Sequence, residues 1–253
     1  MRFVDLSAPI VQSPADMPEP LRTDIEFVDH AAGARQIEAL LKVPSRLLRD
    51  GEGWAIETFT RLGTHNSTHV DAPWHYNSRI RGERAQAIDE LPLDWFFGPG
   101  VVLEMTARGD GERIDVEHVE AELDRVGHEL AEGDIVLVRT GRDAFLAELA
   151  YVALGPAVTA EATRWLYECG VRVMGIDAWG WDGPLHLQAQ EALERDEPGI
   201  FWAAHQCDLD YCQIERLANL AELPASGFQV ACFPLRIAGA GAAPARVVAM
   251  LPE

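Results

Sequence analysis

The sequence predicts a single α/β domain, residues 1–253, in which helices flank a mixed β-sheet. Short runs of β-branched and aliphatic residues, typical of strands, alternate with stretches whose apolar residues have helical spacing. The 253 residues are 48% hydrophobic and 25% charged. This is long enough and apolar enough to bury an ordinary core, so we expect a soluble globular fold.

The first half of the chain mixes extended segments with helices. Residues 3–10 and 55–62 are expected to be extended, with a short helix near residues 34–41. Glycine and proline precede a β-branched run at residues 100–106, which predicts a strand. Apolar residues at positions 114, 116, 119, 123 and 126, ended by Gly127, predict a helix.

The second half continues this alternation. GDIVLVRTG, residues 133–141, is a short continuous apolar run, which is typical of a strand buried on both faces. TAEATRWLYECGVRVMGID, residues 159–177, predicts a helix, a glycine stop and another strand. Two strand-like runs close the chain around AGAGAAPA, which we expect to be a tight connection.

Composition excludes several classes of partner. With 41 acidic and 21 basic residues the net charge is -20, which repels nucleic acid and anionic lipid. No apolar run approaches the roughly 20 residues that a membrane helix needs. The start MRFVDLSAPI has no basic leader, and the four cysteines form no CxxC pair. We expect a cytoplasmic protein with reduced thiols that binds neither nucleic acid nor membrane and acts on a small molecule.

The stretch HNSTHVDAPWH, residues 65–75, concentrates ligand chemistry in His65, His69, Asp71 and His75. Their even spacing would put all four on one face of a strand, but a straight strand would separate the ends by about 33 Å. A regular helix is excluded because Asp71 would point elsewhere and Pro73 would break it. We therefore expect a bent loop, with Gly63 and Pro73 as hinges, that holds a divalent transition metal such as zinc or manganese.

HNSTHVDAPWH resembles the HxGTHxDxPxH signature of the cyclase-like metal-dependent hydrolases, which include bacterial kynurenine formamidases and isatin hydrolases. IERLANLAELP and CFPLRIAGAGAAPARVVAML resemble two further blocks of that family, E-N-L-x-N-L and P-L-K-I-x-G-x-x-x-x-P-x-R. The likeness covers most of the chain after residue 60, with Ser67 where the family usually has glycine. It implies a swivelling β/β/α fold and a homo-oligomer, either a dimer or a tetramer.

The resemblance also implies a ligand set. His65, His69 and Asp71 would bind one ion. In members with two ions, Asp71 bridges to a second, completed here by His75, Glu215 and His205. Glu215 favours two ions, whereas a shorter spacing from His205 to Glu215 leaves His205 either a ligand or a proton-transfer group, and His75 either a ligand or a base.

A metal held by imidazole and carboxylate brings the pKa of bound water to about 7, which predicts hydrolysis by metal-activated water. We assign the catalytic steps to His75, His205 and Glu215. The substrate is expected to be small and aromatic, with a cyclic amide, aryl formamide or lactone bond. Its binding is assigned to Gln213, Trp74, Trp179 and Trp202, with Trp181 as a further aromatic wall.

Two other functions stay open at this point. One is an arylformamidase acting on N-formylkynurenine, which differs only in substrate. The other is a non-catalytic metal-binding protein whose ion is coordinated fully by side chains. Ser67 and Thr68 are assigned to ligand orientation, because a serine nucleophile would need a histidine that is not bound to metal.

Overall fold

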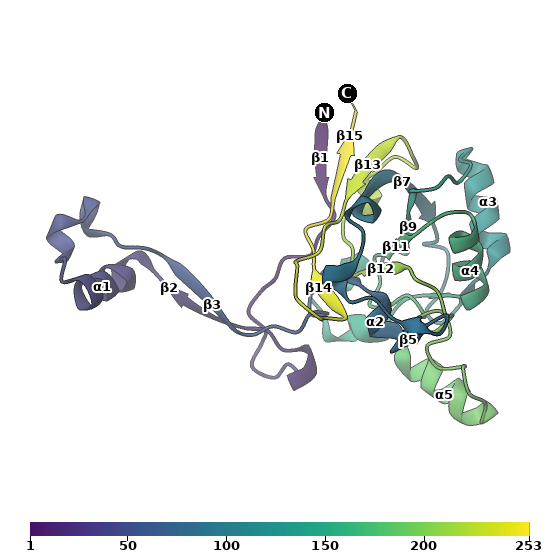
Figure 1. Ribbon diagram of the computed structural model, residues 1–253, viewed down its shortest axis with the longest axis horizontal. Helices are drawn as coiled ribbons and strands as arrows, with labels where there is room; N and C mark the ends of the chain where they lie inside the picture. Colours follow the sequence, from purple (N-terminus) through teal and green to yellow (C-terminus); the bar gives the residue numbers. More distant parts are fainter. Residues whose placement is uncertain (253) are drawn as a thin grey trace. The chain divides into compact units, whose positions relative to one another are not determined.

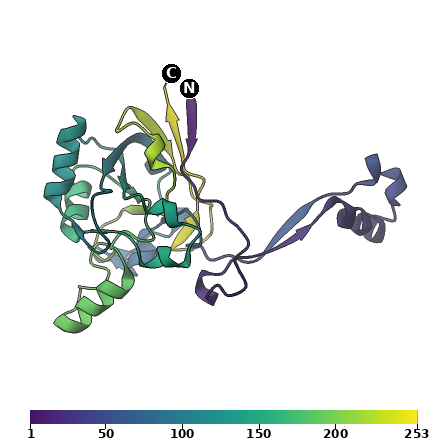
Figure 2. The same cartoon turned by 180° about the vertical axis from the view of Figure 1, so that it is seen from behind.

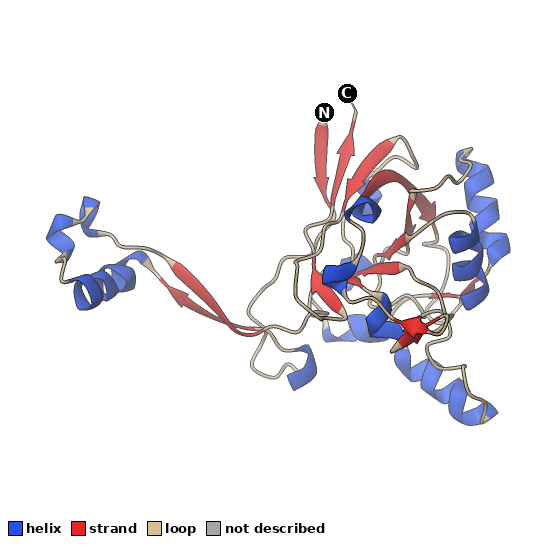
Figure 3. Cartoon of the chain, viewed as in Figure 1, coloured by secondary structure: helices blue, strands red, loops and turns tan. Residues whose placement is uncertain are grey.

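The computed structural model describes residues 1–252, and they form two compact units. The larger unit combines Met1–Pro9 with the chain from Ser67 onward, and the smaller unit is Ile10–Asn66. Figure 1 labels the elements, Figure 2 shows them from behind and Figure 3 separates helix from strand. The α/β class is confirmed, and the single-domain assignment stays a prediction.

The strands of the larger unit are β1 (Arg2–Asp5), β4 (His69–Asp71), β5 (Arg79–Ile80), β6 (Glu83–Arg84), β7 (Phe97–Glu104), β8 (Arg113–Ile114), β9 (Ile135–Arg139), β10 (Ala157–Val158), β11 (Val173–Ile176), β12 (Cys212–Glu215), β13 (Phe228–Ala231), β14 (Ala242–Pro244) and β15 (Val248–Leu251). Its α-helices are α2 (Pro73–Tyr76), α3 (Val116–Val126), α4 (Ala160–Glu168) and α5 (Leu185–Arg195).

A mixed sheet organises this unit. Within the described residues its strand order is β1-β15-β13-β7-β9-β11-β12-β4-β14. The central strands β7, β9, β11 and β12 are parallel, and β4 runs antiparallel to both of its neighbours, β12 and β14. This arrangement confirms the mixed sheet that the sequence predicts.

The sheet buries both of its faces, as the continuous apolar runs predict. Along β9, Val136 and Val138 pack into one core cluster, while Ile135 and Leu137 pack into the other. Helices α3 and α4 lie side by side against the first of these faces (Figures 1 and 2). Gly127 ends α3 with φ 63°, a left-handed conformation that glycine adopts without steric cost.

One connection differs from its prediction. AGAGAAPA is not only a tight connection, because Ala242–Pro244 form β14 and pair with β4. Alanine and glycine give no alternating apolar pattern, so the sequence carries no strand signal there. The small residues serve close packing instead: a Cβ on Gly241 would lie 3.2 Å from the Cα of His75.

The smaller unit consists of an antiparallel hairpin and a helix. β2 (Asp24–Val28) pairs with β3 (Ile56–Arg61), and α1 (His30–Leu41) lies between them in sequence. The predicted helix at 34–41 is correct but starts earlier, because the Asp29 side chain accepts a hydrogen bond from the Ala32 amide and caps the first turn. In residues 1–252, no helix has the length and apolar character to span a bilayer.

Candidate functional site

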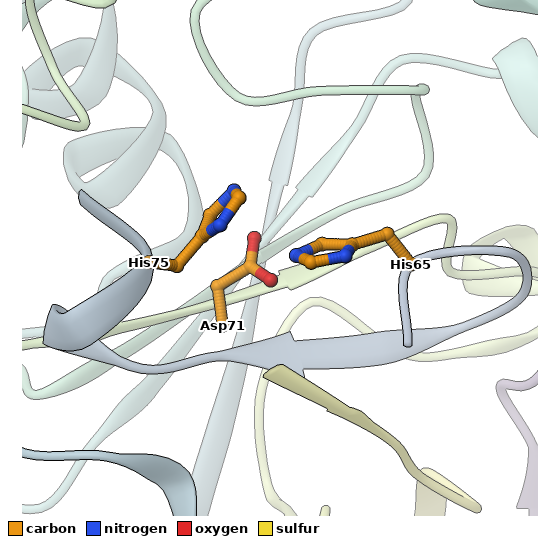
Figure 4. A group of neighbouring side chains, drawn as sticks. All are labelled: His65, Asp71 and His75. Atoms are coloured by element: carbon orange, nitrogen blue, oxygen red, sulfur yellow. The ribbon is translucent and has the colours of Figure 1, made fainter. Parts of the chain in front are cut away.

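The segment 65–75 bends, as expected. Residues 64–65 form a turn and residues 66–68 a bend, His69–Asp71 form β4, and Pro73 begins the short helix α2, where its missing amide hydrogen costs nothing. The His65 and His75 rings flank the Asp71 carboxylate (Figure 4). One ligand atom from each of these three residues lies within 4.8 Å of the other two.

Pairing between β4 and β12 supplies the rest of the cluster. His69 lies opposite Glu215, and Asp71 lies opposite Gln213. Residues two apart on a strand share a face, and directly paired residues do too, so all four polar side chains project from the same side of the sheet. The intervening pair, Val70 and Ile214, packs in the apolar core on the other side.

His69 is oriented by its own backbone. Its Nδ1 atom lies 2.8 Å from the Ser67 carbonyl oxygen, so this nitrogen donates and Nε2 is the acceptor. Nε2 lies 3.3 Å from Asp71 Oδ1 and 3.6 Å from Glu215 Oε2. Burial lowers the pKa of His69, but the two carboxylates, Asp71 above all, raise it further, so the net shift is upward.

Glu215 joins the two halves of the cluster. Its Oε1 atom accepts a hydrogen bond of 3.0 Å from the Trp181 amide and lies 3.7 Å from His205 Nε2. Burial and the nearby Asp71 carboxylate raise the pKa of Glu215, against the opposing effect of His205 and His69. Two buried carboxylates this close call for compensating positive charge.

His205 belongs to the same site despite its short spacing to Glu215. Asp182 accepts hydrogen bonds from His205 Nδ1, from the His205 amide and from the Ala204 amide at 2.7 Å. Burial works to lower the pKa of His205, but Asp182 and then Glu215 raise it to about 9. The ring stacks on Trp202 at 4.7 Å between centroids and lies 5.8 Å from the His75 ring.

Gln213 offers an oxygen to the cluster. Its Nε2 atom donates to the Tyr211 hydroxyl, which itself donates to the Ala204 carbonyl at 2.8 Å. These bonds fix the amide so that Oε1 is the free end. Within the described chain Oε1 is buried and has no hydrogen-bond partner, which is costly unless a cation or a ligand N–H occupies the site.

The donor set fits a divalent transition metal. His69, Asp71 and Glu215 form a second group whose ligand atoms lie within 4.8 Å of one another, and they share Asp71 with the group of His65 and His75. Imidazole nitrogens, carboxylates and an amide oxygen are ligands that zinc and manganese accept. Asp71 is therefore positioned to serve two ions.

The structure separates the four predicted aromatic residues. Trp202 stacks on His205 and lies in the site. Trp179 lies 3.4 Å from the Arg216 guanidinium carbon, measured to the ring centroid. Trp74 is 38% exposed and lies beneath Arg84, so its substrate role stays a prediction. The expectation that Trp181 lines a pocket is wrong, because this side chain is fully buried and packs in the core.

Two residues of the site were not predicted. Asp182, in the WDGP stretch, orients His205 across 23 positions of the sequence, a pairing that spacing alone does not reveal. Arg216 directly follows Glu215, is 8% exposed and lies against Trp179. Burial lowers the pKa of Arg216 to about 10, against the opposing effect of Glu215.

Comparisons with known proteins identify the family of this chain. The family model described as putative cyclase matches residues 4–183. A kynurenine formamidase from Salinibacter ruber is 33% identical over 191 residues, which is 74% of this chain and 76% of that protein. A second, from Maricaulis maris, is 29% identical over 192 residues, covering 74% of this chain and 77% of that protein.

Solved structures share the fold. Isatin hydrolase A from Ralstonia solanacearum superposes with a TM-score of 0.75 at 24% identity, covering 99% of this chain and 92% of that one. Isatin hydrolase A from Labrenzia aggregata gives 0.72 at 24% identity, covering 100% and 94%. The family model matches well over half of the chain, and the relative from Salinibacter ruber is 33% identical to it. The chain belongs to the putative cyclase family.

Proposed function

We propose that the substrate is a small aromatic molecule with an aryl formamide, cyclic amide or lactone bond. The protein is a metal-dependent hydrolase that acts on carbon–nitrogen amide bonds. The observation that carries the proposal is the convergence of His69, Asp71, Gln213 and Glu215 on one face of the paired strands β4 and β12. A structural metal site has every coordination position filled by side chains and needs no proton-transfer group beside it. Here His205 lies beside the cluster, which favours a catalytic site.

The ligands divide into two groups. By the family resemblance, His65, His69 and Asp71 would hold the first ion, and His75 and Glu215 would share Asp71 around a second. The distances in the structure group the same residues differently: His65 and His75 lie nearest Asp71 in one set, and His69 and Glu215 lie nearest it in the other. An ion bound there polarises a substrate carbonyl and makes water acidic enough to attack at neutral pH. Gln213 Oε1 is placed to complete the first group or to accept an N–H from the substrate.

The proton steps fall to His205. Asp182 fixes the tautomer by binding Nδ1, so Nε2 is the nitrogen that faces Glu215 and exchanges protons. A histidine so held can deliver a proton to the departing nitrogen, which would otherwise leave as an unstable anion. Trp202, stacked on the ring, keeps His205 in position and presents a flat apolar surface to an aromatic substrate.

We also propose that the resident metal is zinc or manganese and that the chain forms a homo-oligomer. The mixed nitrogen and oxygen donors support either ion. Several large apolar side chains of the smaller unit are exposed, including Phe27 at 66% and Leu40 at 71%, which supports a protein contact at these surfaces. Light scattering at several concentrations gives the mass of the particle and tests the second proposal.

Hydrolysis assays with defined metal content test the function. Wild-type protein is assayed on N-formylkynurenine, isatin and small lactones as purified, after chelation, and after adding back zinc or manganese. We expect activity to disappear with the metal and to return with it. His69→Ala should lose metal and activity, whereas His186→Ala, at an exposed position of α5, should keep both.

Two outcomes would contradict this account. Stoichiometric metal without hydrolysis of any acyl substrate would indicate a structural metal protein. Full metal content and full activity in His69→Ala would refute the assignment of the first group of ligands.

An arylformamidase acting on N-formylkynurenine is the narrower candidate. The relative of 33% identity favours it, because that protein is a kynurenine formamidase. A kcat/KM for N-formylkynurenine well above that for isatin supports this candidate, and the reverse order supports a cyclic amide.

A further inference from the structure

Arg216 is a buried cation that the proposed reaction does not use. Among residues 1–252, no other lysine or arginine side chain is buried. Arginine stays protonated in proteins, so its charge must be balanced by an anion or by a polar surrounding. The group that balances the charge of Arg216 therefore indicates what binds at this position.

The described chain brings no carboxylate into direct contact with it. No aspartate or glutamate oxygen of residues 1–252 lies within 4.0 Å of its nitrogens, and Nε is buried without a hydrogen-bond partner. The carboxylate of the preceding residue, Glu215, is directed to the Trp181 amide, His69 and His205. If the proposed ions are bound, they neutralise Glu215 and Asp71, and Arg216 then needs a further anion.

The backbone holds Arg216 firmly in this place. Its amide donates to the Ala178 carbonyl at 3.1 Å, and its carbonyl accepts from the Thr68 hydroxyl at 2.5 Å. Its φ of 58° is left-handed, a conformation that favours glycine or asparagine and is uncommon for arginine. A long charged side chain is thus kept at a position where the backbone prefers a small residue, a pattern that occurs at functional sites.

The surroundings suit a flat anion. The guanidinium lies over Trp179, and the same loop binds Glu215 through the Trp181 amide. The loop that contacts the Arg216 guanidinium therefore also contacts the carboxylate of Glu215, the residue proposed to face the metal ions. A guanidinium offers paired N–H donors that match the two oxygens of a carboxylate. The N–H groups on Nη and Nε of one arginine can each donate to one oxygen of a singly charged carboxylate.

We propose that Arg216 binds a carboxylate group of the substrate and that the enzyme therefore prefers anionic aryl amides. This inference rests on the proposed function and names the substrate class of the same site. Arg216 is a specificity residue here, and the amide bond is broken by the groups described above.

A pair of substrates that differ in one carboxylate tests the proposal. Formanilide and N-formylanthranilate are both aryl formamides, and only the second carries a carboxylate. For wild-type protein we expect a higher kcat/KM with N-formylanthranilate. Arg216→Asn, which suits the left-handed backbone, should lower that value about 10- to 100-fold, mainly through KM, and change formanilide by less than about threefold.

Matched variants separate charge from folding. Arg172→Asn removes another arginine that lies over an aromatic ring, Tyr167, and should leave both substrates unchanged. Arg216→Lys keeps the charge but lacks the paired N–H donors of a guanidinium. We therefore expect an intermediate loss of kcat/KM, with N-formylanthranilate only. If Arg216→Asn does not fold, the lysine variant carries the test. An equal loss with both substrates would overturn the proposal and assign Arg216 a structural role.

A binding measurement keeps this test independent of hydrolysis. Benzoate and benzamide are titrated calorimetrically into metal-loaded wild type, Arg216→Asn and Arg172→Asn. We expect Arg216→Asn alone to lose benzoate affinity, by about tenfold or more. Equal benzoate affinity in all three proteins would refute the role of Arg216. Absence of any amide hydrolysis with this binding pattern intact would refute the proposed function and leave the anion site standing.

Discussion

The orientation of His205 depends on one buried carboxylate. Asp182 receives hydrogen bonds from two backbone amides and from the imidazole, so it stays fixed while the ring exchanges protons. An asparagine in its place cannot accept from Nδ1 through its nitrogen end and does not stabilise a charged imidazole.

Asp182→Asn should therefore lower kcat by about 10- to 100-fold with little change in KM. Steady-state kinetics on the best substrate of the wild type checks this. Asp134→Asn is the matched control. The Asp134 carboxylate also pairs with a histidine, His128, at 2.8 Å, but neither residue is a candidate ligand. Equal kcat values for the Asp182 and Asp134 variants would refute the orienting role of Asp182.

Gln213 gives a second prediction at the scale of single residues. If its buried Oε1 is a ligand, Gln213→Leu should weaken metal affinity by about tenfold or more, while the similar volume of leucine preserves packing. Competition with a chelating dye measures that affinity. An unchanged affinity with a raised KM would instead assign Gln213 to substrate binding.

At the scale of elements, the site depends on strand pairing held by Thr68. Its hydroxyl donates to the Arg216 carbonyl at 2.5 Å and accepts from the Ala8 amide at 2.8 Å. It therefore ties the start of β4 to the end of β12 and to the segment after β1.

Thr68→Val should lower the free energy of unfolding by about 2 to 4 kcal/mol, because it leaves the buried Arg216 carbonyl and the partly buried Ala8 amide without this partner. Urea denaturation followed by circular dichroism measures the loss. Thr58→Val, on the exposed strand β3, should change it by less than about 0.5 kcal/mol. A Thr68 variant as stable as the Thr58 variant would contradict this account.

The elements that sequence reasoning predicts best are those with a strong local signal. The continuous apolar run predicts β9 to within a few residues of its observed bounds. The spacing of apolar residues and the stop at Gly127 predict α3 equally well. β14 was missed because alanine and glycine carry no pattern. Convergence of β4 with β12 is a long-range pairing, and the sequence indicated Glu215 only through family resemblance.

At the scale of the whole molecule, buried Asp177 links stability to pH. It accepts hydrogen bonds from the amide and hydroxyl of Thr140 and from the Gly141 amide. Burial nevertheless raises its pKa from 3.8 to about 6. A raised pKa means that the folded state binds the Asp177 proton more tightly than the unfolded state does. The resulting contribution to the free energy of unfolding is fully present below pH 3.8 and is lost as the pH rises through about 6.

Relative to Asp177→Asn, the wild type should lose about 3 kcal/mol of unfolding free energy between pH 3.8 and pH 7, since a pKa difference of about 2 corresponds to about 3 kcal/mol. Urea unfolding of both proteins at several pH values measures the difference, and effects common to both cancel. A difference independent of pH would show that the pKa of Asp177 is not raised by folding.

The central claim is that β4 and β12 together hold the catalytic metal, and anomalous diffraction tests it most directly. Crystals of protein loaded with zinc or manganese are measured at the absorption edge of the metal. We predict a peak bounded by His65, His69 and Asp71, with a second peak beside His75 and Glu215 if two ions bind. A stoichiometric metal peak elsewhere in the molecule, with none among these residues, would contradict the account.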